Sequence, residues 1–164
     1  IKSSNLPFYQ NSGVLVFGSR LRRISEAFLA DVNRIYQHHN IRFDAAWFPI
    51  FYMLSRQGAL SIRDISLELE VSHSAASQLV SKLVEKGLIR SGTDKNDARK
   101  KVVSFTPKGQ KLLLQVQPIW IAVQKAMDTL LAEMPHGSLL MPAIGELEKS
   151  FQSASIFNRI EQYL

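Results

Sequence analysis

Residues 61–87 read SIRDISLELEVSHSAASQLVSKLVEKG and decide the fold of this 164-residue chain. Ser61, followed three residues later by Asp64, is typical of a capping box and predicts the start of a short helix. Its buried edge consists of Ile62, Ile65 and Leu69. Ser72 begins a second helix as its N-cap, and Gly87 suits the position just past the end of that helix. Two short helices joined by a tight turn are the outline of a helix-turn-helix.

The second of these helices has two distinct faces. Its apolar side is formed by Ala75, Ala76, Leu79, Val80, Leu83 and Val84. The other side is short, polar and mostly uncharged, and its candidate contact residues are Ser72, His73, Ser74, Ser77, Gln78, Ser81 and Lys82. Hydroxyl and amide side chains fit into the major groove, which is about 12 Å wide, and can hydrogen-bond to base edges there. The pattern predicts a DNA recognition helix; the alternative is a serine-rich solvent face without a partner.

A hairpin is predicted to follow this helix. Two short strands, 88–91 and 101–105, are joined by a long polar loop. The basic residues of the hairpin are Lys95, Arg99, Lys100 and Lys101. On an extended wing they could lie along phosphates or enter the adjacent minor groove, where the potential is negative. Asp97 is expected to stabilise the loop, either by pairing with Arg99 or by accepting hydrogen bonds from loop amides.

Long amphipathic helices are predicted on both sides of this core. Apolar residues recur every three or four positions over 14–36, which is the period of one helix face. A second apolar run, 45–54, has Asp44 as a plausible N-cap and Gly58 as a stop, and Pro49 kinks that helix or delays its start.

The C-terminal third of the chain is also predicted to be helical. Thr106 and Pro107 begin a helix that extends to about Glu133, which Pro118 should bend. After residues 135–137, a last helical segment runs to about Ile160.

The net charge of +6 is concentrated in one part of the chain. Residues 71–111 carry nine lysines and arginines against three acidic residues, so this stretch accounts for the whole excess. Such a local excess is typical of a surface that binds a polyanion, although a solvated face without a partner has the same composition.

Several classes of protein are not indicated. There is no cysteine, which excludes disulfides and thiolate chemistry. His38 and His39 would project about 100° apart on a helix, so they are poor ligands for one metal, and we predict no metal and no cofactor. No nucleophile elbow, phosphate-binding glycine loop or paired carboxylates appear, so no enzyme is predicted. The apolar runs are too short to span a membrane, and a cytoplasmic location is the default expectation.

From Leu60 to Leu112 the sequence resembles the multiple-antibiotic-resistance regulator (MarR) family. The resemblance is carried by the helix-turn-helix residues 62–65 and 71–80, the segment 83–89, the wing signature Asp97-Ala98-Arg99, and the closing residues 105–109. Three positions depart from the family pattern. Glu70 stands where glycine is usual, Ser66 where alanine is usual, and Phe105 where leucine is more common.

The resemblance implies a mainly α fold with a small β-hairpin wing. It further implies a winged helix-turn-helix core at residues 60–107 within a DNA-binding domain at 41–111, with helical dimerisation regions at 1–40 and 112–164. The expected protein is a homodimeric regulator, with repression as the expected mode, that reads a pseudo-palindromic operator in double-stranded DNA. Recognition-helix residues would contact the major groove, and Arg99 would enter the minor groove.

Members of the family often bind small aromatic ligands. An aromatic effector pocket is a candidate here, lined by Trp47, Phe48, Phe51, Tyr52 and His39, although aromatic clusters at helical spacing usually belong to the core. Two other functions stay open at this point: a winged helix that binds protein instead of DNA, and the DNA-binding part of a longer fused protein.

Overall fold

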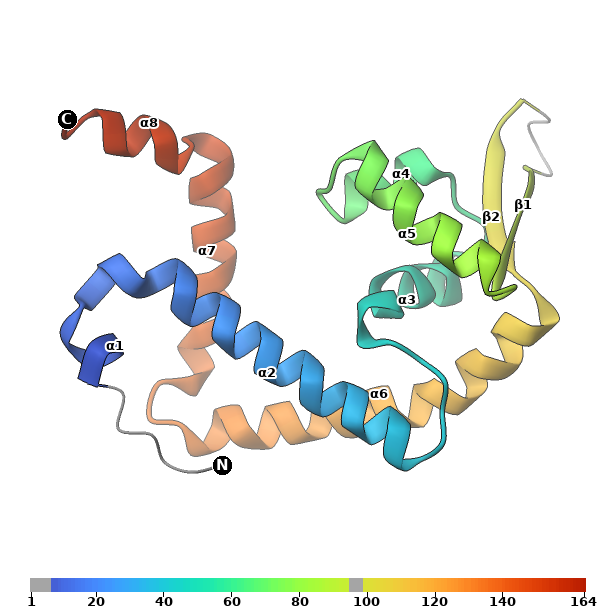
Figure 1. Cartoon of the computed structure of the whole chain (residues 1–164), viewed down its shortest axis with the longest axis horizontal. Coiled ribbons are helices and arrows are strands. Elements are labelled where there is room, and N and C mark those ends of the chain that lie inside the picture. Colours follow the sequence, from blue (N-terminus) through green and yellow to red (C-terminus); the bar gives the residue numbers. More distant parts are fainter. Residues whose placement is uncertain (1–6, 95–98) are drawn as a thin grey trace. The chain divides into compact units, whose positions relative to one another are not determined.

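The computed structural model describes residues 7–94 and 99–164, and it is mostly helical with one two-stranded antiparallel sheet (Figure 1). This confirms the expected mainly α fold with a β-hairpin wing. The chain divides into two compact units, residues 1–119 and 120–164, so that the boundary falls inside one long helix.

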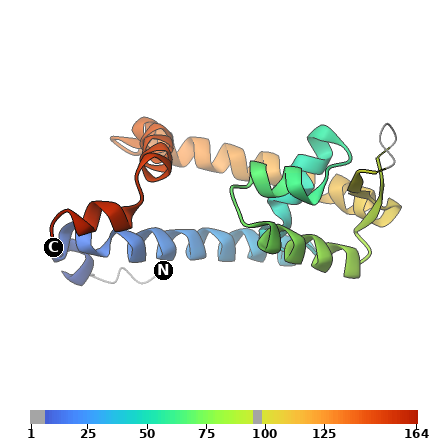
Figure 2. The same ribbon diagram turned by 90° about the horizontal axis from the view of Figure 1, so that it is seen from above.

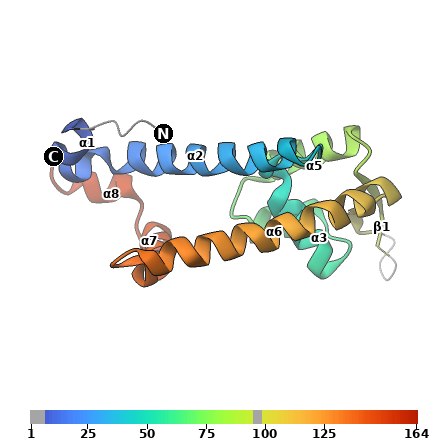
Figure 3. The ribbon, with the colours of Figure 1, turned by 90° about the horizontal axis from the view of Figure 1, so that it is seen from below.

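The first unit contains the helix-turn-helix and the hairpin. Its described elements, in chain order, are α1 (Pro7–Asn11), the 3-10 helix η1 (Gly13–Val16), α2 (Phe17–His38), the 3-10 helix η2 (Ala45–Trp47), α3 (Phe48–Gln57), α4 (Ile62–Glu68), α5 (His73–Glu85), β1 (Ile89–Thr93), β2 (Lys101–Phe105) and the first part of α6 (Pro107–Glu133). The second unit comprises the rest of α6, the 3-10 helix η3 (Gly137–Leu139), α7 (Leu140–Ser153) and α8 (Ile156–Glu161). Figure 3 shows α2 as a single unbroken helix.

Side-chain caps determine where α4 and α5 begin. The Ser61 hydroxyl accepts a hydrogen bond from the Asp64 amide at 3.1 Å, and the Asp64 carboxylate accepts one from the Ser61 amide at 3.2 Å. The predicted capping box is therefore confirmed. Ser72 caps α5 by accepting a hydrogen bond from the Ala75 amide at 3.1 Å, as predicted.

The turn between α4 and α5 holds Glu70 in the left-handed region, with φ of 52°. This is the position where the MarR pattern usually has glycine, the residue for which that conformation has no steric cost. Glu70 therefore keeps the backbone conformation of the turn, and its Cβ makes that conformation strained.

The hairpin is held on both edges of β2. Its two strands pair antiparallel with Ile89 opposite Phe105 and Thr93 opposite Lys101. On the other edge, Leu60 and Val103 exchange two backbone hydrogen bonds of 3.1 and 2.7 Å, which ties the segment before α4 to the sheet. β1 continues to Thr93, two residues beyond its predicted end at Ser91, because the pairing with β2 extends that far.

The core of the first unit lies beneath α5. Its largest fully buried side chains are Tyr36, Ile50, Phe51, Ile65, Leu83, Ile89, Val103 and Val116. They come from α2, α3, α4, α5, both strands and α6, so burial of their apolar surface holds the helix-turn-helix against the wing and the start of α6. Figure 2 shows α4 and α5 next to one another, close to the hairpin.

Of two further predicted segments, one has the delayed start that Pro49 allowed and the other differs from the structure. Asp44 caps the 3-10 helix η2 through the Ala46 amide at 2.9 Å, and the α-helix starts only at Phe48 with Pro49 in its first turn, where a missing amide proton costs nothing. The prediction of one helical segment up to Ile160 is wrong. α7 ends at Ser153, Ala154 is extended, and Ser155 caps a separate helix, α8, by accepting a hydrogen bond from the Asn158 amide at 3.2 Å.

The strain at Glu70 predicts a gain in stability on substitution. Left-handed backbone costs a residue with a Cβ roughly 1–2 kcal/mol, and glycine gives part of this back as entropy of the unfolded chain, so Glu70→Gly should raise the free energy of unfolding by about 1 kcal/mol. Urea denaturation followed by circular dichroism measures it. The matched control, Glu26→Gly in the middle of α2, should lower stability by about 1 kcal/mol. A loss of stability in Glu70→Gly would contradict the prediction.

Candidate nucleic-acid interface

The predicted groove-facing residues of α5 lie on its solvent side. Ser72, His73, Ser74, Gln78, Ser81 and Lys82 are exposed, and Ser77 is half-buried. Three residues on the opposite side, Ala76, Val80 and Leu83, are buried in the core. Ala75 and Val84, which were assigned to the apolar side, are exposed, so the buried stripe is narrower than predicted. The helix thus presents a polar face with its orientation set by the core.

The C-terminal end of α5 is held by residues at the start of α6. The Thr106 hydroxyl donates a hydrogen bond to the Gly87 carbonyl at 2.7 Å and accepts one from the Gly109 amide at 3.0 Å. The Lys108 ammonium donates to the Lys86 carbonyl at 2.7 Å. Gly87, just past the C-cap Lys86, has φ of 67°, which suits glycine. The Thr106-Pro107 pair indicated a helix start, but no sequence signal indicated that the same residues support the recognition helix.

Gly109 is required by the close approach of these two segments. A Cβ at this position would run into the carbonyl oxygen of Leu88. The first turn of α6 therefore packs directly against the backbone that leaves α5.

The wing residues of the hairpin fall into two groups. Arg99, Lys100 and Lys101 are exposed, whereas Lys95 and Asp97 lie outside the described residues, and with them the predicted pairing of Asp97 and Arg99. At the base of the loop, the Asp94 amide donates to the Lys100 carbonyl at 2.8 Å, which extends the ladder between the strands by one bond.

Lys100 has a structural partner. Its ammonium lies 3.0 Å from the Asp64 carboxylate. Asp64 therefore both caps α4 and binds the wing. The hydrogen bond with the Ser61 side chain, and after it the hydrogen bond from Lys100, lowers the pKa of Asp64. Lys100 was predicted to contact DNA; in this structure its charge is engaged by α4, and its side chain is 47% exposed.

The five predicted pocket residues differ in burial and in the rings that they contact. Phe51 is fully buried in the core, with its ring 5.0 Å from that of Phe43 and 4.9 Å from that of Phe105, and its place in a ligand pocket stays a prediction. Phe48 and Tyr52 stack on each other at 5.3 Å and are part-exposed, and His39 is exposed with its ring against His38.

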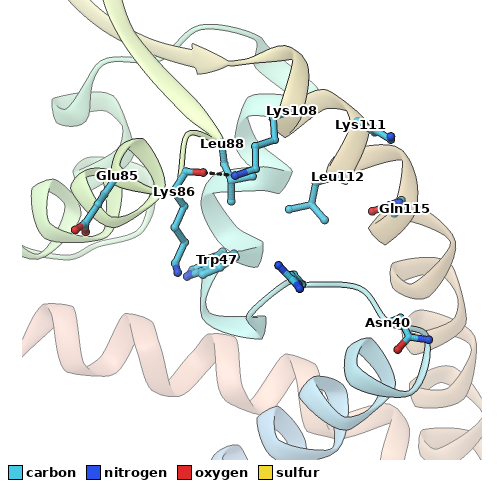
Figure 4. Close-up of a pocket in the computed structure, with 10 residues that line it drawn as sticks. Asn40, Trp47, Glu85, Lys86, Leu88, Lys108, Lys111, Leu112 and Gln115 are labelled. Atoms are coloured by element: carbon cyan, nitrogen blue, oxygen red, sulfur yellow. Dashed lines mark hydrogen bonds between the residues drawn. The ribbon is translucent and has the colours of Figure 1, made fainter.

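Trp47, the fifth of these residues, lines a pocket in the first unit. The pocket has a volume of about 620 Å³ and is formed by Asn40, Arg42, Trp47, Glu85, Lys86, Leu88, Lys108, Lys111, Leu112 and Gln115. Figure 4 shows the Lys86 side chain extending to Trp47 and the Lys108 side chain reaching the main-chain oxygen of Lys86. The sequence analysis assigned none of the lysines to such a site, because they come from separate segments.

The part of the chain that the structure describes holds neither a metal-ligand cluster nor a membrane-spanning helix. No group of three or more histidine, cysteine, aspartate or glutamate side chains there is placed to hold a metal ion. Among the same residues, no helix combines the length and apolarity that crossing a membrane requires.

The role of Asp64 predicts a pH-dependent loss of stability on substitution. Asp64→Asn removes the ion pair with Lys100 and should lower the free energy of unfolding at pH 7 by about 1 kcal/mol or less, since the pair is partly exposed. The pKa of Asp64 is lower in the folded state than its ordinary value of about 3.9. The ionised carboxylate therefore contributes to stability when the pH is above that ordinary pKa, and the contribution is lost as the pH falls through the folded-state pKa.

Urea titrations at pH 7 and pH 3 measure this difference, which should shrink at the lower pH. Asp31→Asn is the control, because its ion pair with Arg34 lies on the surface of α2. An unchanged difference at pH 3 would show that Asp64 acts through its shape and not through its charge.

The sequence and the fold were compared with those of known proteins. The model of the MarR family matches residues 43–100. No curated protein matches the sequence. Among solved structures, a MarR/EmrR family transcriptional regulator from Acinetobacter sp. ADP1 is 21% identical, with a TM-score of 0.67 over 83% of this chain and 94% of that one. The S. aureus MepR–DNA complex is also 21% identical, with a TM-score of 0.64 over 84% and 96%.

A third structure, of Bordetella bronchiseptica BpsR, was described for the regulation of its DNA binding by 6-hydroxynicotinic acid. It is 22% identical, with a TM-score of 0.58 over 81% of this chain and 98% of that one. These likenesses extend over most of each chain and establish the fold. The family model places the sequence similarity to MarR proteins in the winged-helix region, residues 43–100.

Proposed function

We propose that this chain is a transcriptional regulator that binds double-stranded DNA sequence-specifically as a homodimer, with repression as its mode of action. The observation that carries the proposal is the polar face of α5, which is exposed except at half-buried Ser77 while the helix is held at both ends. A reader of base edges needs such a face, because the contacts that specify sequence are made by side chains whose position is determined in advance.

The chemistry of this face suits direct readout. Gln78 is exposed near the middle of α5 and offers an amide that can pair in two places with adenine. His73 and Ser74 lie in the first turn, the part of a recognition helix that contacts base edges in helix-turn-helix proteins. Lys82, one turn after Gln78, is placed to meet phosphate.

The hairpin supplies positive charge beside this face. Arg99 and Lys101 are exposed on the wing, and phosphate contacts from such residues position a protein on DNA without reading its sequence. The solved MepR structure, which contains DNA, supports this assignment for the shared fold. The MarR family match supports it for the winged-helix region.

Dimerisation is proposed from the exposed apolar residues of the terminal helices. On α2 these are Phe17, Leu21, Ile24, Phe28 and Ile35. In the second unit, α8 and the residues after it expose Ile156, Phe157, Ile160, Tyr163 and Leu164. Contiguous apolar residues left in water mark an interaction surface. We assign regions 1–40 and 112–164 to dimerisation and region 41–111 to DNA binding. The operator of a two-fold symmetric dimer is then expected to be a pseudo-palindrome.

Substitution of Gln78 should separate readout from general affinity. After selection of a bound sequence from a random DNA pool, Gln78→Ala should lose about 1–3 kcal/mol of preference for that sequence over random duplex. Lys101→Ala should weaken binding to both equally, and Gln110→Ala, an exposed glutamine on α6, should change neither.

Fluorescence anisotropy measures these affinities at several salt concentrations. If the dimer contacts about 6–10 phosphates, affinity should fall by roughly 10³–10⁵ between 50 and 200 mM salt. Equal losses on selected and random DNA for Gln78→Ala would remove this residue from readout. Association that does not depend on salt would exclude DNA as the partner and favour a protein.

The dimer is tested by placing charge on the apolar side of α2. Leu21→Glu combined with Ile24→Glu should give a monomer in sedimentation velocity and weaken operator binding, because a dimer interface would have to bury unpaired carboxylates. Both side chains are exposed, so the fold of the monomer should be kept. Arg20→Glu, also exposed on α2, is the control. A double variant that sediments as a dimer would contradict the assignment.

A further inference from the structure

The ion pair between Asp64 and Lys100 lies where the helix-turn-helix meets the wing. Lys100 Nζ is 3.0 Å from Asp64 Oδ2, and the two side chains are 47% and 35% exposed. The next residue, Lys101, begins β2, is exposed, and takes part in none of the ion pairs found among the described residues. Two neighbouring lysines of the wing therefore differ in charge state, because a carboxylate of α4 neutralises only Lys100.

Backbone hydrogen bonds, and not this ion pair, fix the base of the wing. Leu60 and Val103 exchange two such bonds of 3.1 and 2.7 Å, and the Asp94 amide donates to the Lys100 carbonyl at 2.8 Å. Figure 1 shows the segment that enters α4 reaching β2. A partly exposed ion pair adds about 1 kcal/mol or less. Loss of the pair therefore leaves the base of the wing in place, and its main consequence is a change in local charge.

The Asp64 carboxylate cannot follow Lys100 toward another partner. The oxygen that meets Lys100, Oδ2, also accepts a hydrogen bond from the Ser61 amide at 3.2 Å, so the capping box holds the side chain at the start of α4. The pKa of Asp64 is below its ordinary value, so the carboxylate is charged at pH 7. If Lys100 turned to a phosphate, it would leave an unpaired negative charge beside a polyanion.

We propose that Asp64 limits the affinity of this protein for nucleic acid, because it withholds Lys100 from the phosphates. This inference rests on the proposed function, since the wing is the proposed phosphate contact. Phosphate contacts carry the sequence-independent part of binding, so with Lys100 withheld the base contacts of α5 make up a larger share of the binding free energy. The alternative is that the pair orients the wing for DNA. The two readings predict opposite signs for the loss of Asp64.

The decisive variant is Asp64→Asn, with binding to random-sequence duplex measured by fluorescence anisotropy over a salt series. One more phosphate contact per subunit should steepen the slope of log affinity against log salt by about 0.9. If that contribution vanishes near 1 M salt, affinity at about 0.1 M should rise by roughly eightfold per subunit. A loss of stability or of wing orientation would lower the affinity instead. Asp64→Glu keeps the charge and the usual capping-box residue, so it should bind like the native chain.

Two further variants show whether the gain comes from Lys100. The double variant Asp64→Asn with Lys100→Gln lacks both charges and should bind about as well as the native chain, whose pair carries no net charge. Asp31→Asn removes the carboxylate that pairs with Arg34 at 3.1 Å on α2, with the same change in net charge, and should alter DNA affinity by less than about twofold. Unchanged or weaker binding by Asp64→Asn would overturn the proposal. So would a gain that Asp31→Asn matches, or one that persists in the double variant.

Elution from immobilised heparin separates this inference from the proposed function. Heparin is a sulfated polyanion that recruits exposed lysines without any base readout, so Asp64→Asn should elute at higher salt than the native chain and than Asp31→Asn. If no duplex is bound under any condition, the proposed function fails, while the heparin result still decides whether Asp64 withholds Lys100. If an operator is bound but Asp64→Asn gains on neither duplex nor heparin, the role of Asp64 alone is wrong.

Discussion

The Thr106 hydroxyl is the contact that joins the end of α5 to the start of α6. It donates to the carbonyl of Gly87, just past α5, and accepts from the amide of Gly109 in the first turn of α6. One side chain therefore caps the helix that follows the wing and binds the end of the helix that precedes it. Gly109 must lack a Cβ for this approach, because the carbonyl of Leu88 occupies the space. The hairpin between them is consequently anchored at both of its ends.

The basic residues of 71–111 make different contacts in the structure. Lys100 is engaged by Asp64, and Lys86, Lys108 and Lys111 line the pocket. The sequence located the whole net charge of +6 in this stretch, yet charge alone cannot say whether a lysine meets phosphate, a carboxylate of its own chain or a ligand. That distinction depends on contacts between segments distant in sequence, as between α4 and the wing.

The features predicted correctly from the sequence are local. Ser61 with Asp64, Ser72, Gly87 and Thr106-Pro107 act within a few residues of their own position, so their types reveal their roles. The candidate recognition face followed from the same helical period. The break at Ala154 was missed because the apolar pattern continues across it, and the small residues around it also occur inside helices. The pocket was missed because the aromatic cluster at 47–52 looked like a single site, whereas tertiary packing places Phe51 in the core.

Glu70 shows how these constraints combine. A non-glycine residue in the left-handed region persists only where the surrounding structure determines its conformation. Here the capping box sets the start of α4, Ser72 sets the start of α5, and Ile65 and Leu83 are buried beneath them, so the turn has little freedom to relax. The caps and the core therefore determine the orientation of the candidate recognition face, and the turn adopts the conformation that they require.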